Sequence, residues 1–486
     1  MTFKRTLLAA AITSATLATG TAHATNGYFS HGFGVKSSGM AGGGVAFAND
    51  SAMVIATNPA GITDVSNQVT GDITWFSPRR GYDFTTQYSA TVMGPNGPMN
   101  VSDTINGSAE SDKESFFLPA FGFTYALTDR DSVGLAVYGN GGMNTDFDAT
   151  SDNYLGFGFV PNQPPGPYGA GKAGVNLEQM FISPTYAREL IENKLSIGIS
   201  PIITLQRFKA NGLTNFNGTG PIPQMINGMI AGGQLPPGTP PFPSFSVDGE
   251  NMTNNGTDTA WGYGGKLGVT FKPNDMITLG ASYQTKIRTD EFDEYSGLFA
   301  ESGDFDIPST WTVGLAADVT EDITVTFDYQ RINYGEVKSI SNPSNEYLFM
   351  CMGGDTTKCL GGSDGAGFGW DDIDVFKLGV QWQAMPNLQL RAGWNRGDNP
   401  ISSDDALFNT IAPGVMEDHF TAGFSYAFNK QHELHGSLMY APEVEVDGKN
   451  PLLSGLAQQY LGASYDQDLT IRMKQYSATV GYTYKF

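Results

Sequence analysis

The chain has 486 residues and a formal net charge of −22, and it combines 61 Gly, 31 Phe and 21 Tyr with only 16% charged residues. The acidity argues against a nucleic-acid partner, because binding to phosphates needs a basic surface. No run of about 18 apolar residues follows the first 24 positions, which excludes helical membrane spans, whereas the aromatic residues and glycines fit a transmembrane β-barrel or a soluble exported β-protein.

Residues 1–24 have the features of a cleaved signal peptide. Lys4 and Arg5 form a positive start, a mostly small and apolar stretch follows over 7–19, and Ala22-His23-Ala24 fits a cleavage site. The apolar stretch is too short for a retained membrane anchor. We therefore expect the mature chain to begin at Thr25.

Residues 25–66 differ from the rest of the mature chain, because they are rich in Gly, moderately apolar and without sustained alternation. One interpretation is a disordered periplasmic tail, but such tails are usually poor in apolar residues. The other interpretation is a plug, since a wide barrel has a lumen that side chains alone do not fill. We expect the plug.

Residues 67–486 show the alternation of transmembrane β-strands. Between Trp261 and Phe271 one face carries large apolar side chains, and the other carries glycines, Lys266 and Thr270. An apolar outer face and a small, polar inner face are typical of barrel strands. The same pattern closes the chain at Phe486.

Short polar turns divide this region into hairpins, and much longer loops lie between them. The turns are 128–131, 192–194, 272–275, 320–322, 385–387 and 429–431. Short turns in the periplasm and long loops outside are usual for outer-membrane barrels. With both chain ends in the periplasm, these turns predict a closed, antiparallel, all-β barrel of about 14 strands.

The loop over 211–257 could capture a hydrophobic ligand. Its Met225, Met229 and Phe242 are apolar, and 223–234 could form a short amphipathic helix. Apolar surface facing water suggests binding, and methionine gives it an adaptable shape. The alternative is that these side chains only pack the loop on itself.

Strand parity places several side chains in the lumen. Lys266, Arg288 and Arg391 fall on the inner face and could pair with a carboxylate head group, or simply with acidic residues of the wall. Phe116 and Leu118 also point inward and would line an apolar pocket. Within strands, prolines favour a bulge or break, so Pro119 and Pro201 mark either a lateral exit or a plain bulge.

Cys351 and Cys359 lie in one Gly-rich segment. An exported chain meets an oxidising compartment, so we expect a disulfide between them. A metal site would need more ligands than this segment offers.

Three patches carry a resemblance to a known family. They are the run 36–46 followed by Asn49-Asp50 and Asn58-Pro59-Ala60-Gly61, the run 408–426, and the run 195–201. They resemble the long-chain fatty acid transporter family of the outer membrane (FadL/TodX-type), in which Asn-Pro-Ala marks the hatch. The resemblance implies a fourteen-strand barrel with a hatch over 25–66, ligand capture in an outer-loop groove, transfer to an inner pocket, and hatch-gated lateral release.

Together these features predict a monomeric transporter of the bacterial outer membrane that takes up long-chain fatty acids passively, without a cofactor, among outer-membrane lipid and lipopolysaccharide. Aromatic or aliphatic hydrocarbons are the alternative cargo. An outer-membrane lipid-modifying enzyme is the alternative of another class. It would need a Ser–His pair at the membrane surface, and His435 with Ser437 on one strand face is the only hint of one. We therefore expect no enzyme.

Overall fold

The computed structural model describes residues 26–94, 97–150, 155 and 166–486. The predicted signal peptide, 1–24, lies outside the described residues. Among the described residues, no helix is both long enough and apolar enough to cross a membrane.

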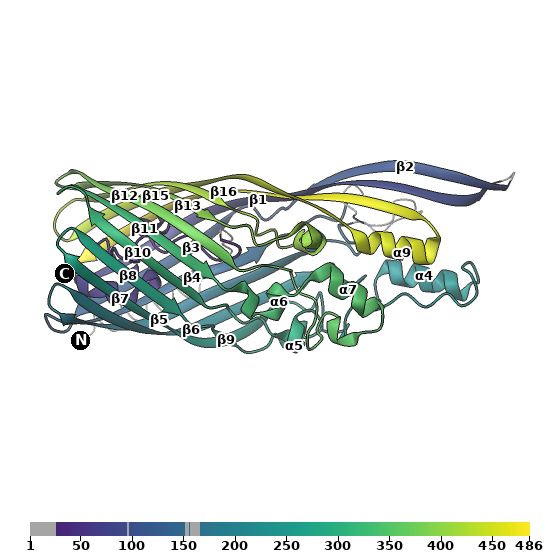
Figure 1. The fold of residues 1–486 in the computed structure, drawn as a ribbon, viewed down its shortest axis with the longest axis horizontal. Helices are drawn as coiled ribbons and strands as arrows, with labels where there is room; N and C mark the ends of the chain where they lie inside the picture. The colour runs from purple at the N-terminus through teal and green to yellow at the C-terminus, as the bar shows by residue number, and fades with distance from the viewer. Residues whose placement is uncertain (1–25, 95–96, 151–154, 156–165) are drawn as a thin grey trace.

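Antiparallel strands form a closed barrel, and the prediction of 14 strands is confirmed (Figure 1). β1 and β16 close it with continuous pairing from Gln68 opposite Lys485 to Ser89 opposite Ser464. The barrel strands are β1 (Gln68–Gly94), β3 (Phe116–Ala126), β4 (Asp131–Asn144), β5 (Gly174–Ile191), β6 (Leu195–Asn211), β7 (Asp258–Asn274), β8 (Ile277–Gln284), β10 (Thr310–Asp318), β11 (Ile323–Ile332), β12 (Ile373–Met385), β13 (Leu388–Gly397), β14 (Asp418–Ala427), β15 (His432–Lys449) and β16 (Ser464–Lys485).

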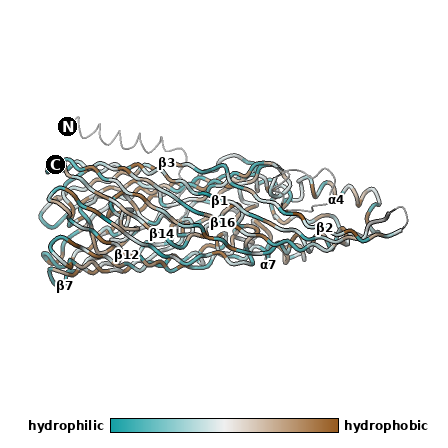
Figure 2. The backbone as a smooth tube through the Cα atoms, turned by 90° about the horizontal axis from the view of Figure 1, so that it is seen from above, coloured by the Kyte–Doolittle hydropathy of each residue, from teal (hydrophilic) through white to brown (hydrophobic). Residues whose placement is uncertain are grey.

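Alternation along the strands separates the two faces of the wall. In β7, Trp261, Tyr263 and Leu267 are exposed on the outside, whereas Lys266 and Thr270 are buried on the inside. Figure 2 shows this pattern as hydrophobic positions that alternate with polar ones along the barrel. The outward side chains form the apolar surface that a lipid bilayer requires.

The two ends of the barrel differ. The six predicted short turns join paired strands at one end, the turn end, where the carboxyl terminus also lies (Figure 1). The long loops gather at the other end, the loop end, where β1 and β2 (Gly97–Glu110) project beyond the barrel as a hairpin.

The loops contain further short elements. The short strand β9 (Arg288–Thr289) pairs with β7. The helices of the loop end are α4 (Pro221–Ala231), η3 (Asp293–Tyr295), α5 (Ala300–Gly303), η4 (Tyr334–Glu336), α6 (Lys338–Ser341), α7 (Ser344–Met352), η5 (Thr356–Lys358), η6 (Ser403–Asp405), α8 (Ala406–Asn409) and α9 (Pro451–Leu461).

Residues 26–66, here called the hatch segment, lie inside the barrel. They contain α2 (Val35–Ser38), α3 (Val54–Thr57) and η1 (Pro59–Asp64). Backbone amides of the hatch segment donate hydrogen bonds to inward side chains of three strands. Asp72 of β1 accepts from Val35, and Thr421 of β14 accepts from Ala41. Asp328 of β11 accepts from both Gly44 and Val45. The segment therefore contacts the wall on several sides.

The expected disulfide joins Cys351 to Cys359, with 4.9 Å between their Cα atoms. It links the end of α7 to the residue that follows η5.

Candidate transport path

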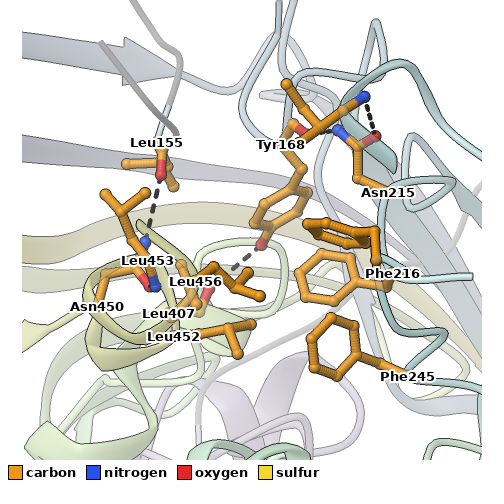
Figure 3. A pocket seen from close by; sticks show the side chains of 12 residues that line it. Leu155, Tyr168, Asn215, Phe216, Phe245, Leu407, Asn450, Leu452, Leu453 and Leu456 are labelled. Carbon is orange, nitrogen blue, oxygen red and sulfur yellow. Dashed lines mark hydrogen bonds between the residues drawn. The ribbon is translucent and has the colours of Figure 1, made fainter. Parts of the chain in front are cut away.

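A pocket opens among the loops of the loop end (Figure 3). It encloses about 520 Å³ of space, part of it open to solvent. Four separate loops supply its walls, so it exists only in the folded protein. The lining residues are Leu155, Tyr168, Asn215, Phe216, Ile222, Phe242, Phe245, Leu407, Asn450, Leu452, Leu453 and Leu456.

The few polar groups of this loop pocket bond to the protein itself. Asn450 donates to the Leu155 carbonyl (3.2 Å) and accepts from the Leu453 amide (3.0 Å). Tyr168 donates to the Leu407 carbonyl (3.2 Å), and burial raises the pKa of its phenol, which keeps the group neutral. None of the described lining residues is charged. The pocket therefore offers an apolar surface without a partner for a carboxylate.

The predicted capture residues of loop 211–257 have different positions. Phe242 lines the pocket. Met225 and Met229 lie on α4 and are half-buried against the loop core without lining the pocket, which corresponds to the packing alternative for these two. The expected helix exists, beginning at Pro221, two residues before the predicted start, and ending at Ala231, three before the predicted end.

A chain of aromatic rings leads from the loop pocket to the hatch segment. Neighbouring ring centroids lie 5.3 to 6.2 Å apart, within the range of aromatic packing. The order of this aromatic chain is Phe216, Phe408, Phe368, Trp370, Tyr334 and Tyr28. It connects the loop pocket, through Phe216, with the hatch segment, through Tyr28.

Tyr334 holds the beginning of the hatch segment. Its hydroxyl donates to the Asn26 carbonyl (2.6 Å) and accepts from the Tyr28 amide (3.2 Å). Gly27 between them has φ +62°, and a Cβ there would lie 2.4 Å from the Tyr334 hydroxyl. Glycine is therefore required at this close approach.

The same beginning of the hatch segment bonds to β4. The Ser30 amide donates to the Asn140 carbonyl (2.9 Å), and the Gly142 amide donates to the Tyr28 carbonyl (3.0 Å). A bulge in β4 between Gly139 and Gly141 accompanies these bonds. Residues 26–34, here called the hatch tip, thus form part of the sheet hydrogen bonding.

The barrel wall has an unpaired stretch next to this contact. β3 and β4 pair only from Phe121 opposite Val137 to Ala126 opposite Ser132. Toward the loop end, residues 116–120 of β3 pair with β1 alone, and residues 138–144 of β4 pair with β5. Beside this part of β4, where β3 is not paired, the hatch tip bonds to the edge of β4 instead.

Phe116 and Leu118, both predicted to point inward, lie at this gap. Leu118 lines an inner cavity of about 410 Å³, together with Pro119, Tyr138 and hatch residues that include Phe33. Phe116 is buried, with the Arg80 guanidinium 5.9 Å from its ring centroid. The other predicted proline, Pro201, lies where the β5–β6 pairing is interrupted between Ile182 and Tyr186. Both prolines therefore accompany breaks in the wall.

The lumen cations hold the hatch segment. Lys266 donates to the Ala56 carbonyl, and Lys377 donates to the His31 carbonyl (3.2 Å). Arg391 donates to the Asn49 side chain (3.2 Å). Lys266 and Arg391 thus face inward as predicted, but they donate hydrogen bonds to oxygens of the hatch segment and, for Arg391, also to Gln381, Gln389 and Ser425 of the wall.

The inward prediction for Arg288 is wrong. β8 ends at Gln284, and no ladder pairing covers residues 285–287. Ile287 is buried on the inside, and Arg288 is exposed opposite Tyr263 on the outer face. The parity counted from β8 is lost across this irregular stretch, which shifts Arg288 to the other side.

Asn58, Pro59 and Ala60 form an anchor between hatch and wall. The Asn58 amide group donates to the carbonyls of Val45 (2.7 Å) and Val269 (3.0 Å), and its oxygen accepts from the Ala60 amide (3.0 Å). Pro59 begins η1, where its missing N–H costs nothing. Gly268 of β7 makes room, since a Cβ there would lie 2.0 Å from the Asn58 oxygen.

Sequence reasoning missed α9 and the aromatic residues Tyr334 and Trp370. A start signal for α9 is present, because Asn450 caps the helix and Pro451 opens it. Nothing local marks the two aromatic residues, whose partners are far away in sequence. His435, considered for an enzyme, bonds to Ser425 (2.7 Å) and Thr483 (2.9 Å) in the lumen.

Comparison with known proteins gives one family and several similar structures. Two toluene transporter structures are similar, TodX of Pseudomonas putida and TbuX of Ralstonia pickettii. Each is 17% identical and covers 94% of this chain and 99% of its own chain, with TM-scores of 0.58 for TodX and 0.53 for TbuX. A FadL homologue of Pseudomonas aeruginosa is also similar, with 16% identity, coverage of 95% of this chain and 100% of its own chain, and a TM-score of 0.60.

At this identity the structures show a shared fold. No curated protein matches the chain. The family model described as outer membrane protein transport protein (OMPP1/FadL/TodX) matches residues 15–486. The chain therefore belongs to this family of bacterial outer-membrane proteins, which transport hydrophobic compounds.

Proposed function

We propose that the protein takes up hydrophobic compounds passively in three steps. The ligand is captured in the loop pocket, moves along the aromatic chain to the hatch tip, and leaves sideways between β3 and β4. The observation that carries this proposal is the continuous aromatic chain between an uncharged pocket and the hatch tip. Removing apolar surface from water drives the capture, at roughly 25 cal/mol per Å².

The unpaired stretch between β3 and β4 supports a lateral exit. The hatch tip covers the edge of β4 there, and the inner cavity with Leu118 reaches the same place. When the tip moves, the edge is uncovered and an apolar ligand passes into the bilayer without crossing the polar turn end. The segment 25–66 acts as the gate in this proposal.

Uncharged hydrocarbons are the cargo that the loop pocket favours. Burying a carboxylate in an apolar pocket without a partner is costly, and no described lining residue is charged. Two of the structurally similar proteins, TodX and TbuX, are toluene transporters. The lumen cations that would pair with a carboxylate already bond to the hatch segment.

Long-chain fatty acids are the second candidate. A cavity of about 510 Å³ between hatch and wall is lined by both Lys266 and Lys377. A shift of the hatch segment would free these two ammonium groups for a carboxylate. Mass spectrometry of compounds extracted from the purified protein separates the candidates: neutral compounds alone contradict fatty acid cargo, and carboxylates alone contradict hydrocarbon cargo.

Uptake of labelled toluene by cells that produce the protein tests the capture step. Leu453→Glu places an unpaired carboxylate in the loop pocket and should lower uptake by roughly tenfold or more, because an unpaired buried charge is costly. Gln458→Glu makes the same charge change on the exposed face of α9 and should leave uptake unchanged. Equal uptake by the two variants contradicts capture in this pocket.

A further inference from the structure

The outer face of β6, β7 and β9 carries cations that the transport path does not use. Arg207 and Lys209 point outward from β6, and Arg288 points outward from β9. Register places Arg207 opposite Thr259 of β7, and Arg288 opposite Tyr263 of the same strand. These three residues and the exposed Trp261 and Tyr263 are here called the outer cationic face.

The depth of this face follows from β7. Its outward side chains from Phe271 to Trp261 span ten residues, which is about 34 Å along a strand. At a tilt of about 40° they cover roughly 26 Å of height, which matches the apolar band of an outer-membrane barrel with its aromatic girdle. Trp261 and Tyr263 therefore mark the loop-end edge of the bilayer. Arg207 lies beyond that edge, at the depth of the lipid head groups.

Other outward cations near this rim are paired with carboxylates. Arg331 bonds to Asp374 (2.8 Å), and Lys474 bonds to Glu443 (3.1 Å). Arg396 has Glu417 at 2.9 Å. A cation with such a partner has little charge left for a lipid phosphate, because the carboxylate already occupies its hydrogen-bond donors.

Lys209 and Arg288 are different. Of the Lys and Arg within the described residues, four have neither an ion pair nor a side-chain hydrogen bond: Lys194 and Lys430 in the short turns, and Lys209 and Arg288 on the outer cationic face. Arg207 pairs with Glu178 (3.2 Å). Asp290 shares the face of Arg288 without an ion pair between them.

Arg288 lies level with Tyr263 at the edge of the bilayer, and Lys209 lies two residues beyond Arg207, so the two cations border the head-group layer. Neither has a carboxylate partner, which is unexpected in a chain with a net charge of −22. Burial does not explain them, because Arg288 is exposed and Lys209 is only half-buried. Arg288 and Ile203 of β6 are two strand spacings apart, about 10 Å, and Lys209 lies six residues, about 20 Å, further along β6, so the backbones of Lys209 and Arg288 are about 22 Å apart with Arg207 between them. A head group that carries more than one phosphate would contact both strands.

We propose that the outer cationic face binds the phosphorylated head group of lipopolysaccharide in the outer leaflet. Lys209 and Arg288 supply the positive charge, the Arg207–Glu178 pair flanks them, and Trp261 and Tyr263 pack against the upper part of the acyl chains. The aromatic rings suit this position, because their apolar body and polar edge match the membrane interface. This site is separate from the transport path and does not depend on the proposed cargo.

Binding of purified lipopolysaccharide to the delipidated protein in detergent tests the proposal. The double variant Lys209→Ala/Arg288→Ala should bind roughly 30-fold more weakly, since each cation near an anionic membrane surface contributes about a factor of five. The control Lys194→Ala/Lys430→Ala removes the same charge from the two unpaired cations at the turn end and should bind like the unchanged protein. The circular dichroism spectra of both variants should match that of the unchanged protein, which shows that the barrel is folded.

A second arm identifies the chemical group. Dephosphorylated lipopolysaccharide should bind to the unchanged protein as weakly as intact lipopolysaccharide binds to the Lys209→Ala/Arg288→Ala variant. Equal binding of intact lipopolysaccharide by both double variants overturns the proposal. Equal binding of the intact and dephosphorylated forms also overturns it, because the face would then recognise sugars or acyl chains and not phosphate.

Discussion

The two ends of the hatch segment are held by different chemistry. Toward the turn end, ion pairs tie it to the wall: Lys36 to Glu433 (3.3 Å), Asp50 to Lys485 (2.5 Å) and Asp64 to Lys272 (2.9 Å). The hatch tip contains no Asp, Glu, Lys or Arg; it packs on aromatic rings and is held by hydrogen bonds with Tyr334, β4 and Lys377. An apolar ligand can replace aromatic packing, but it cannot replace an ion pair.

This difference divides the hatch segment into a fixed part and a movable part. Displacing the tip exchanges one apolar contact for another and breaks its hydrogen bonds with Tyr334, β4 and Lys377, but it breaks no ion pair. Displacing the turn-end part would leave several buried charges and carbonyls unpaired. Changes that loosen either part alone therefore test the comparison directly.

Removing the Asn58 anchor should have the largest effect. Asn58→Leu leaves the Val45 and Val269 carbonyls without this donor and the Ala60 amide without an acceptor, and we expect a loss of about 3 kcal/mol in stability. Chemical denaturation measures the loss, and single-channel recording should show a leak through the loosened lumen. Asn255→Leu, at a half-buried asparagine whose bonds to backbone carbonyls are exposed to solvent, is the control and should cost less than about 1 kcal/mol. A closed, equally stable Asn58→Leu protein would refute the fixed part.

Loosening the tip should have a smaller and local effect. Tyr334→Phe keeps the ring but removes the hydroxyl that bonds to Asn26 and Tyr28, which should cost about 1 to 2 kcal/mol. Hydrogen exchange of the Tyr28 amide should become roughly tenfold faster, while the amides near Asn58 keep their rates. Tyr329→Phe, on the outer face beside Asp374, is the matched control and should not change exchange in the tip. Uniformly faster exchange across residues 26–66 would show that the segment moves as one body.

The smallest expected effect is a pH dependence of the loop end. Burial, and then the neighbouring Asp306, raise the pKa of Asp304 from its ordinary value of 3.8 to about 7. Since the folded pKa lies above the unfolded one, the loop is most stable below about pH 4 and loses stability as pH rises toward 7. Because the group is partly exposed, we expect less than about 1 kcal/mol. Loop hydrogen exchange at pH 5 and pH 8 measures this, and Asp304→Asn should remove the difference.

The barrel could be predicted because every strand repeats the same two-residue alternation, and each short turn breaks it visibly. The error at Arg288 shows the limit: parity holds only while pairing is continuous, and the stretch after Gln284 interrupts it. The inward position of Lys266 was predictable, but its partner, Ala56, was not, because 210 residues separate them. The aromatic chain was not predictable for the same reason, since its rings come from separate loops.

The ion pairs of the hatch segment also bear on how the molecule is assembled. Lys36 pairs with Glu433, and Asp50 pairs with Lys485, one residue before the end of the chain. The segment that leaves the ribosome early thus completes its contacts only when the last strand is in place. Such long loop closures are slow, so the plug should settle after the wall has closed. A chain cut short before β16 would then have neither a sealed wall nor a seated plug.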